Sequence, residues 1–256
     1  MGTDFSFEVV SADDYDALRP DYAAKAAAWV AERGGLGAGS LVVDLAAGTG
    51  QLCRRFAPLG VDLVAIEPAR NMRTVIEERL PGVRALDGTA ESIPLGDGGA
   101  DAVVVGNAFH HFDSGLAFAE IRRVLRPGGV LALFWARSGE CEDERHPLIR
   151  EIDAVAERVR VTSPIASAYR GWYDTPGAVA GFTAFERRSF PTVHALPSDR
   201  LGDLFATSSD IAALPPTKRA SLIRRIRELA RGLPEILELP ARSEVDLCLR
   251  ETKGAR

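Results

Sequence analysis

The stretch Leu41–Gly50, LVVDLAAGTG, constrains the fold of this chain more than any other. It opens with apolar, mostly β-branched residues, which are typical of a strand buried on both faces of a parallel sheet. Asp44 stands near the carboxyl end of that strand. Gly48 and Gly50 allow a tight turn and a close backbone approach to a ligand, and residues 51–59 are predicted to form a helix with free N–H groups at its start. The order of strand, glycine turn and helix predicts a site for a ligand that carries a ribose or a phosphate.

The spacing of the glycines separates two classes of nucleotide ligand. A dinucleotide site has a third glycine three residues after the second, and here that position holds Cys53. The order of acid, two small residues and Gly-Thr-Gly instead resembles the first motif of the class I S-adenosylmethionine-dependent methyltransferases. An NAD(P)-dependent oxidoreductase is therefore the less favoured interpretation.

Later segments resemble the same family, in the same order. The matching segments are Glu67-Pro68 after the second predicted strand, GTAESIPL at 88–95, the strand 102–105, NAFHHF at 107–112 and VLRPGG at 124–129, which leads into a strand over 130–135. They resemble the small-molecule enzymes, a group that includes the ubiquinone and menaquinone methyltransferases. The resemblance implies S-adenosylmethionine as cofactor and in-line transfer of its methyl group to an O, N or C atom of a small metabolite. A methyltransferase fold repurposed as a non-methylating natural-product cyclase is the alternative.

The resemblance also implies which residues hold the cofactor. Glu67 would accept hydrogen bonds from both ribose hydroxyls. Asp44 and the backbone near it would lie beside the methionyl ammonium, and Arg19 would bind the methionyl carboxylate. Tyr15 and Arg19 could otherwise serve in helix packing. The full predicted set is Tyr15, Arg19, Asp44, Ala46, Gly48, Gly50, Glu67, Pro68, Thr89, Ala90, Glu91 and Asn107.

Two positions depart from the family's common pattern. Many relatives carry glycine where this chain has Ala46, so we expect an ordinary backbone φ there. Thr89 stands where relatives often place an aspartate beside the adenine amino group, and its hydroxyl can bond but supplies no charge. The adenine contact would then rest on backbone groups and Ala90, while Glu91 either assists or is solvated.

His110 and His111 follow the predicted fourth strand, at the edge where open α/β sheets bind ligands. An unperturbed pKa of about 6.5 suits removal of a proton from a hydroxyl or an amine, so either is a candidate catalytic base. In the alternative interpretation, one histidine packs against the sheet and the other orders the loop. Catalysis then needs no base and depends on alignment of the reactants. His146 and His194 are interpreted as structural or exposed, and no ligand spacing predicts a metal site.

The alternation of strands and helices predicts the fold class. Strands are expected near 41–45, 62–67, 83–86, 101–106 and 130–136. Because such units require right-handed crossovers, we expect an α/β, Rossmann-like, doubly wound and mainly parallel sheet. The resemblance implies seven strands with an antiparallel C-terminal strand. Within a single domain over 1–256 we assign 1–35 to an N-terminal helical cover, 36–137 to the cofactor-binding half, 138–181 to an acceptor-side insertion and 182–256 to the C-terminal part of the sheet and its helices.

The second half of the chain has a looser pattern. Tyr169, Trp172 and Tyr173 form an aromatic cluster in the insertion, which either covers the acceptor or packs the insertion onto the sheet. The predicted elements are a helix over about 146–161, a strand over 182–190, helices over 198–208 and 217–231, and a final strand over 245–249.

Composition indicates one soluble enzyme domain. A net charge of −5 on 256 residues gives no electrostatic reason to bind nucleic acid. We expect a cytoplasmic protein that acts on a small molecule and has no membrane partner, because no signal peptide or stretch of ~20 apolar residues is present. Cys53, Cys141 and Cys248 are widely spaced and expected to be reduced thiols.

Overall fold

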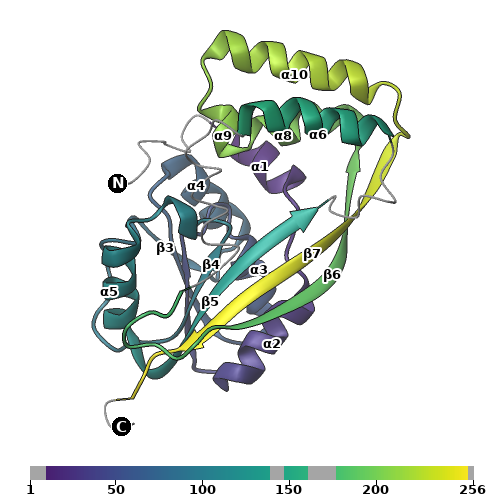
Figure 1. Cartoon of the computed structure of the whole chain (residues 1–256). Coiled ribbons are helices and arrows are strands. Elements are labelled where there is room, and N and C mark those ends of the chain that lie inside the picture. Colours follow the sequence, from purple (N-terminus) through teal and green to yellow (C-terminus); the bar gives the residue numbers. More distant parts are fainter. Residues whose placement is uncertain (1–9, 139–146, 161–176, 253–256) are drawn as a thin grey trace.

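The computed structural model describes residues 10–138, 147–160 and 177–252. Its centre is a seven-stranded sheet in the order β3-β2-β1-β4-β5-β7-β6 (Figure 1). The pairs among β1 to β5 are parallel, and β7 lies antiparallel between β5 and β6, which confirms the predicted fold class. The strands span Leu41–Leu45 (β1), Asp62–Ile66 (β2), Arg84–Leu86 (β3), Ala100–Gly106 (β4), Leu125–Ser138 (β5), Glu186–Pro197 (β6) and Ile236–Leu249 (β7).

The central strands are buried on both faces because their side chains alternate between two apolar cores. Val42 and Val104 belong to one core, which also contains residues of α2 and α3. Val43 and Val103 belong to the other core, which contains residues of α5. The continuous apolar runs of the sequence therefore correspond to strands covered on each side. The helices flanking the sheet are α2 (Ala24–Gly34), α3 (Gln51–Phe56), α4 (Arg70–Arg79) and α5 (Ser114–Val124).

A layer of helices lies beyond one end of the sheet, at the top of Figure 1, and we call it the cap. It consists of α6 (Pro147–Arg160), α8 (Leu201–Ala206), α9 (Ser209–Ala212) and α10 (Pro216–Ala230). These helices share an apolar core with residues from the far ends of β6 and β7, such as Leu196 and Leu237. The long antiparallel pair β6–β7, whose connecting segment carries α8, α9 and α10, therefore joins the cap to the sheet. Within the described segments, no helix is long and apolar enough to cross a membrane.

The last two strands differ from their predicted bounds. The predicted strand over 182–190 is displaced, since β6 begins at Glu186 and Phe182 contributes only an isolated bridge. β7 begins at Ile236, well before the predicted strand. Pro191 and Pro240 interrupt the sequence pattern. Pro191 lies in β6, the edge strand of the sheet, and Pro240 lies in a part of β7 that pairs with β6 alone. Each proline therefore stands where the strand has a neighbour on one side only, which is where sheets tolerate proline.

Candidate functional site

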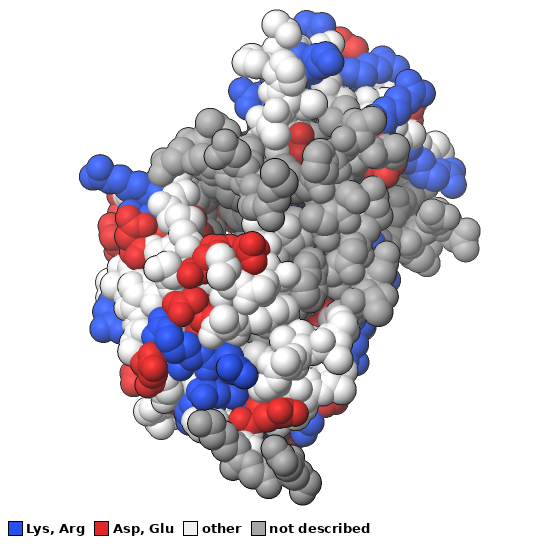
Figure 2. Space-filling view, turned by 60° about the vertical axis from the view of Figure 1, so that its left-hand side comes forward, with Lys and Arg blue, Asp and Glu red and all other residues white. Residues whose placement is uncertain are grey.

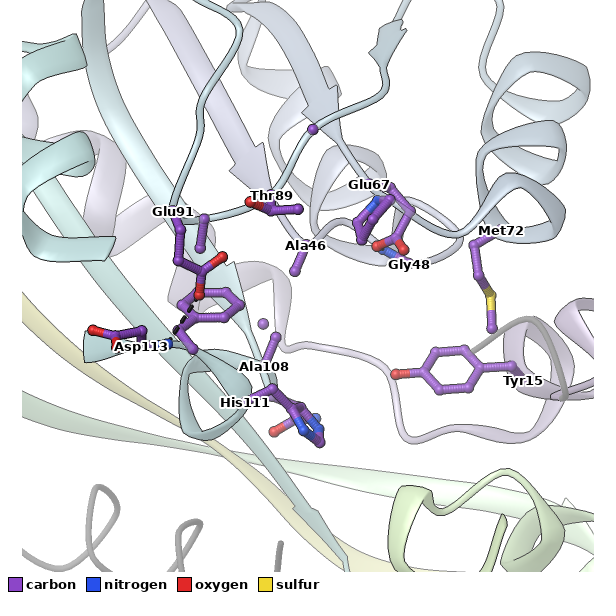
Figure 3. Close-up of a pocket in the computed structure, with 16 residues that line it drawn as sticks. Tyr15, Ala46, Gly48, Glu67, Met72, Thr89, Glu91, Ala108, His111 and Asp113 are labelled. Atoms are coloured by element: carbon purple, nitrogen blue, oxygen red, sulfur yellow. Dashed lines mark hydrogen bonds between the residues drawn. The ribbon is translucent and has the colours of Figure 1, made fainter. Parts of the chain in front are cut away.

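A cavity of about 410 Å³ opens at the carboxyl ends of β1, β2 and β4. The strand order changes direction between β1 and β4, and open α/β sheets bind ligands at such a point. Figure 3 shows side chains from several separate segments converging on this space. The predicted site residues that line the cavity are Tyr15, Ala46, Gly48, Glu67, Pro68, Thr89, Ala90, Glu91, Asn107 and His111.

Ala46 and Asn107 are the two non-glycine residues with positive φ in the described part of the chain, at +55° and +50°. The expectation of an ordinary φ at Ala46 is therefore wrong. The chain must turn directly after β1 while the Ala47 N–H still reaches the Ile66 carbonyl oxygen at 3.1 Å. A left-handed alanine costs about 1–2 kcal/mol, and strain of this kind concentrates at functional sites. Both residues line the cavity, which supports its role as the ligand site.

Glu67 is held at the end of β2 by two backbone donors. Its Oε2 accepts the Gly48 N–H and its Oε1 accepts the Ala69 N–H, each at 2.9 Å. The side chain is 5% exposed and lies beside Gly48 at the cavity wall (Figure 3). Each carboxylate oxygen has further lone pairs, so the group can still accept hydrogen bonds from a ligand.

Asp44 lies in β1 close to the turn and does not line the cavity within the described residues. Its Oδ2 accepts hydrogen bonds from the Cys53 N–H and the Cys53 thiol, both at 3.2 Å. Burial raises the pKa of Asp44 to about 7, although the Cys53 contacts oppose the shift. Gly50 begins α3 at φ +81°, and a Cβ there would approach Leu80 Cδ1 to 2.7 Å. Gly50 therefore serves turn geometry and packing.

The loop after β3 forms the opposite wall. Thr89 and Ser92 pair through their backbones, with N–O distances of 3.4 and 3.3 Å, and this pairing presents Thr89 and Ala90 to the cavity. Glu91 accepts the Asp113 N–H at 2.9 Å, the dashed contact in Figure 3. Glu91 therefore orders the start of α5 in addition to lining the cavity, a role that neither sequence-based alternative included.

The two adjacent histidines take different places. His111 lines the cavity, whereas His110 does not line it within the described residues and packs between His111 and Trp135 with tilted rings. Burial lowers the pKa of His111 to about 4, and the Arg19 charge lowers it further. Burial, His111 and Arg19 together lower the pKa of His110 to about 2. Both imidazoles are therefore neutral at neutral pH.

Tyr15 and Arg19 of the first helical segment form a stacked pair. Tyr15, in α1 (Ala12–Leu18), points its ring into the cavity (Figure 3), and the Arg19 guanidinium carbon lies 5.2 Å from the ring centroid. Arg19 itself lines a neighbouring cavity, and its Nη2 donates to the Thr207 carbonyl oxygen at 2.9 Å. Its predicted contact with the cofactor carboxylate stays a prediction.

Several lining residues carried no role in the sequence-based prediction. Gly88, Ala108 and Phe112 stand inside motifs that were identified, so their proximity could have been inferred from neighbours. Met72 lies in α4, and its thioether reaches the cavity wall only because α4 packs beside α1. The complete additional set is Met72, Gly88, Gly106, Ala108, Phe112 and Asp113. His194 is buried and bonds the Leu18 carbonyl oxygen, in agreement with a structural role, and His146 lies outside the described residues.

Comparison with known proteins identifies the relatives of this chain. Residues 43–133 match the family described as methyltransferase domain. An uncharacterized methyltransferase of Mycobacterium tuberculosis is 34% identical over 251 residues, which cover 93% of this chain and 92% of the relative. A demethylmenaquinone methyltransferase of Renibacterium salmoninarum is 34% identical over 96 residues, covering 37% of this chain and 40% of that protein. A solved candidate type II methyltransferase of Anaeromyxobacter dehalogenans shares the fold with a TM-score of 0.64 at 23% identity, covering 91% of this chain and 98% of that chain.

Proposed function

Because the chain belongs to the S-adenosylmethionine-dependent methyltransferases, we propose that it moves the cofactor's methyl group to an O, N or C atom of a small metabolite. The cofactor supplies a methyl group on a sulfonium, which is already electrophilic when bound. The protein's task is to bind, align and shield the reactants from water. The observation that carries the proposal is Glu67, a buried carboxylate fixed by the Gly48 and Ala69 N–H groups at the cavity wall.

The cofactor-binding roles follow the lining of the cavity. We assign the two ribose hydroxyls to Glu67 and the adenine to the loop with Thr89 and Ala90. The methionyl ammonium would lie near Asp44, next to the backbone of Ala46, Gly48 and Asn107. The fit is supported by the two left-handed residues, which turn the backbone at the cavity, and by Tyr15, which closes its side.

At the acceptor end we assign the contact to His111 rather than His110, because only His111 of the two lines the cavity among the described residues. A neutral imidazole can accept a hydrogen bond from a hydroxyl or an amine and so orient it. With a pKa of about 4, His111 is a weak base, so alignment provides most of the catalysis. His110 supports the His111 ring from behind.

Replacement of Glu67 tests the proposal. We expect Glu67→Ala to weaken S-adenosylmethionine binding by roughly 1.5–3 kcal/mol, about tenfold or more, because its charge-assisted hydrogen bonds to the ribose are lost. Glu67→Gln is the matched control, since it keeps the side-chain size and one carbonyl acceptor. Its affinity for S-adenosylmethionine should lie between those of the parent protein and Glu67→Ala. Calorimetric titration measures the affinities, and circular dichroism verifies the fold. Unchanged affinity in a folded Glu67→Ala protein would exclude this role.

Two further titrations separate the alternatives. NAD(P)H should not bind, because the third glycine of a dinucleotide site is replaced by Cys53. Formation of S-adenosylhomocysteine in the presence of an acceptor would establish methyl transfer. Cofactor binding without product for any acceptor tested would instead favour the cyclase alternative.

A further inference from the structure

We infer that the smaller cavity beside the cofactor cavity is the acceptor subsite, and that it takes a compact apolar acid whose carboxylate is held by Arg19. This inference rests on the proposed methyl transfer, because it names the substrate class of the same site. The smaller cavity has a volume of about 160 Å³ and lies between the cap and the end of β5. Its apolar wall consists of Ile149, Ile152, Leu201, Leu204, Phe205 and Leu239.

Arg19 provides the charged end of this cavity. Its Nη2 donates to the Thr207 carbonyl oxygen at 2.9 Å, while its Nε is buried and has no hydrogen-bond partner among the described residues. A buried polar group without a partner costs free energy, so a ligand that accepts from Nε is stabilised there. Arg19 also stacks on Tyr15, which lines the cofactor cavity. The guanidinium therefore lies at the boundary between the two cavities.

The surroundings of Arg19 favour an anion. Burial lowers the pKa of His110, His111 and His194, and the Arg19 charge lowers each of them further, so these imidazoles carry no charge at neutral pH that would compete with Arg19 for an anion. Within the described residues no carboxylate forms a salt bridge to Arg19. Asp153 lines the same cavity and is the one acidic side chain in its described lining, so it opposes anion binding and limits its strength.

Size narrows the ligand class. A cavity of about 150 Å³ lined by Leu, Ile and Phe holds a benzene molecule in another protein. The cavity here has a similar volume and an apolar wall of the same residue types, to which Arg19, Ser208 and Asp153 add polar groups, so a ring-sized acid such as benzoate fits its chemistry. Arg19 is thereby assigned to the acceptor instead of to the cofactor's carboxylate.

The experiment compares benzoate with benzamide, its uncharged isostere, by NMR titration of the full chain saturated with S-adenosylhomocysteine. Benzoate should bind at least tenfold more tightly than benzamide, because only benzoate forms a charge-assisted pair with Arg19. In Arg19→Gln that preference should disappear while the affinity for S-adenosylhomocysteine stays within twofold. In Asp153→Asn benzoate should bind more tightly than in the parent, because the opposing charge is removed.

The outcomes separate this inference from the proposed function. Equal binding of benzoate and benzamide by the parent protein, or no binding of either, would overturn the inference. A tenfold loss of S-adenosylhomocysteine affinity in folded Arg19→Gln would also overturn it, because Arg19 would then hold the cofactor. Failure of the parent protein to bind S-adenosylhomocysteine would count against the proposed function, while the benzoate titration repeated without cofactor still tests the subsite. If Arg19→Gln does not fold, the parent comparison and Asp153→Asn decide.

Discussion

Two carboxylates approach the first turn of this protein, and their surroundings give them different tasks. Glu67 accepts two backbone N–H groups and faces the cavity. Asp44 is buried within β1 against the Cys53 thiol, and burial raises its pKa to about 7. A carboxylate that is fixed by N–H donors stays ionised and can accept hydrogen bonds from hydroxyls. A partly protonated carboxyl group instead loses its proton when a cation binds nearby.

The raised pKa of Asp44 predicts proton-linked cofactor binding. Below pH 7 the free Asp44 is mostly protonated, and a ligand ammonium nearby favours the ionised form. The affinity for S-adenosylhomocysteine should therefore rise between pH 6 and pH 7.5, by up to about tenfold per pH unit. Calorimetry at several pH values measures this, and Asp44→Asn should abolish the dependence. Equal affinity of the parent protein across that range would contradict the placement of the ammonium at Asp44.

The lowered pKa of His111 predicts a flat pH profile near neutrality. Because the folded pKa of about 4 lies below the ordinary value, the imidazole is neutral above about pH 5 and gains a proton only in stronger acid. Titration of His111 should therefore cause no change in turnover rate from pH 6 to 8. His111→Ala should lower the turnover rate about 10²-fold with unchanged cofactor affinity. His110→Ala is the control and should have a smaller effect. A rate that rises through pH 6.5 would show that the titrating group is a different one.

At the scale of elements, the turn between β1 and α3 shapes one wall of the larger cavity, where we propose that the cofactor binds. Gly48 has a φ of +56°, and a Cβ there would point toward Tyr15 Cε1 at 3.8 Å, on the cavity side. The turn brings the Gly48 N–H to Glu67. The backbone conformation and the ligand surface therefore depend on the same residue.

Gly48→Val should lower cofactor affinity at least tenfold, since a branched side chain strains the left-handed turn and obstructs the cavity. Gly35→Val is a matched control, because Gly35 also has a φ of +60° and a Cβ there would meet nothing within 4 Å. Thermal unfolding should show a similar loss of stability in both variants, of order 1–3 kcal/mol. The titration should show weakened binding in Gly48→Val alone. If Gly35→Val lost affinity equally, the effect would come from strain and not from the site.

At the scale of the whole molecule, the sheet and the cap have separate cores. The larger cavity, the proposed cofactor site, lies at the ends of the sheet strands, and the cap closes the smaller cavity over the end of β5. Figure 2 shows basic side chains over the cap, on the solvent side of α10. Two arginines of α10 pair with acids of neighbouring helices, Arg227 with Asp203 and Arg225 with Glu151, in keeping with a solvated face.

Ile226→Ala tests whether the core of the cap contributes to stability without affecting cofactor binding. Ile226 is fully buried in the cap, so its truncation should lower the free energy of unfolding by about 2–5 kcal/mol. Urea unfolding measures the loss, and Leu222→Ala, at a half-buried position of the same helix, should lose less. Cofactor affinity should stay within twofold while acceptor turnover falls. A matching loss of cofactor affinity would indicate that cap and sheet form one coupled unit.

The sequence by itself determined the sheet and most of the lining of the larger cavity, because each contributing segment is a short run at a strand end. The turn with Gly48, the Glu67-Pro68 pair and the loop with Thr89 and Ala90 were predicted in this way, and right-handed crossovers bring strand ends to one edge. Tertiary structure decided the left-handed φ of Ala46, since a hydrogen bond from the adjacent Ala47 to β2 holds the turn. It also decided that His111 and not His110 reaches the cavity.

The assembly of the cap could likewise not be predicted from the local sequence pattern. Its helices come from residues 147–160 and 201–230, and the sequence predicts each helix but not that they share a core. The antiparallel pair β6–β7 that joins this core to the sheet contains prolines. Local propensity disfavours proline in a strand, but a ladder with a partner on one side only tolerates it. Arg19 lies at the boundary of the two cavities only because α1 packs against both α4 and α8. Such placements depend on contacts between residues far apart in the chain, which no local pattern specifies.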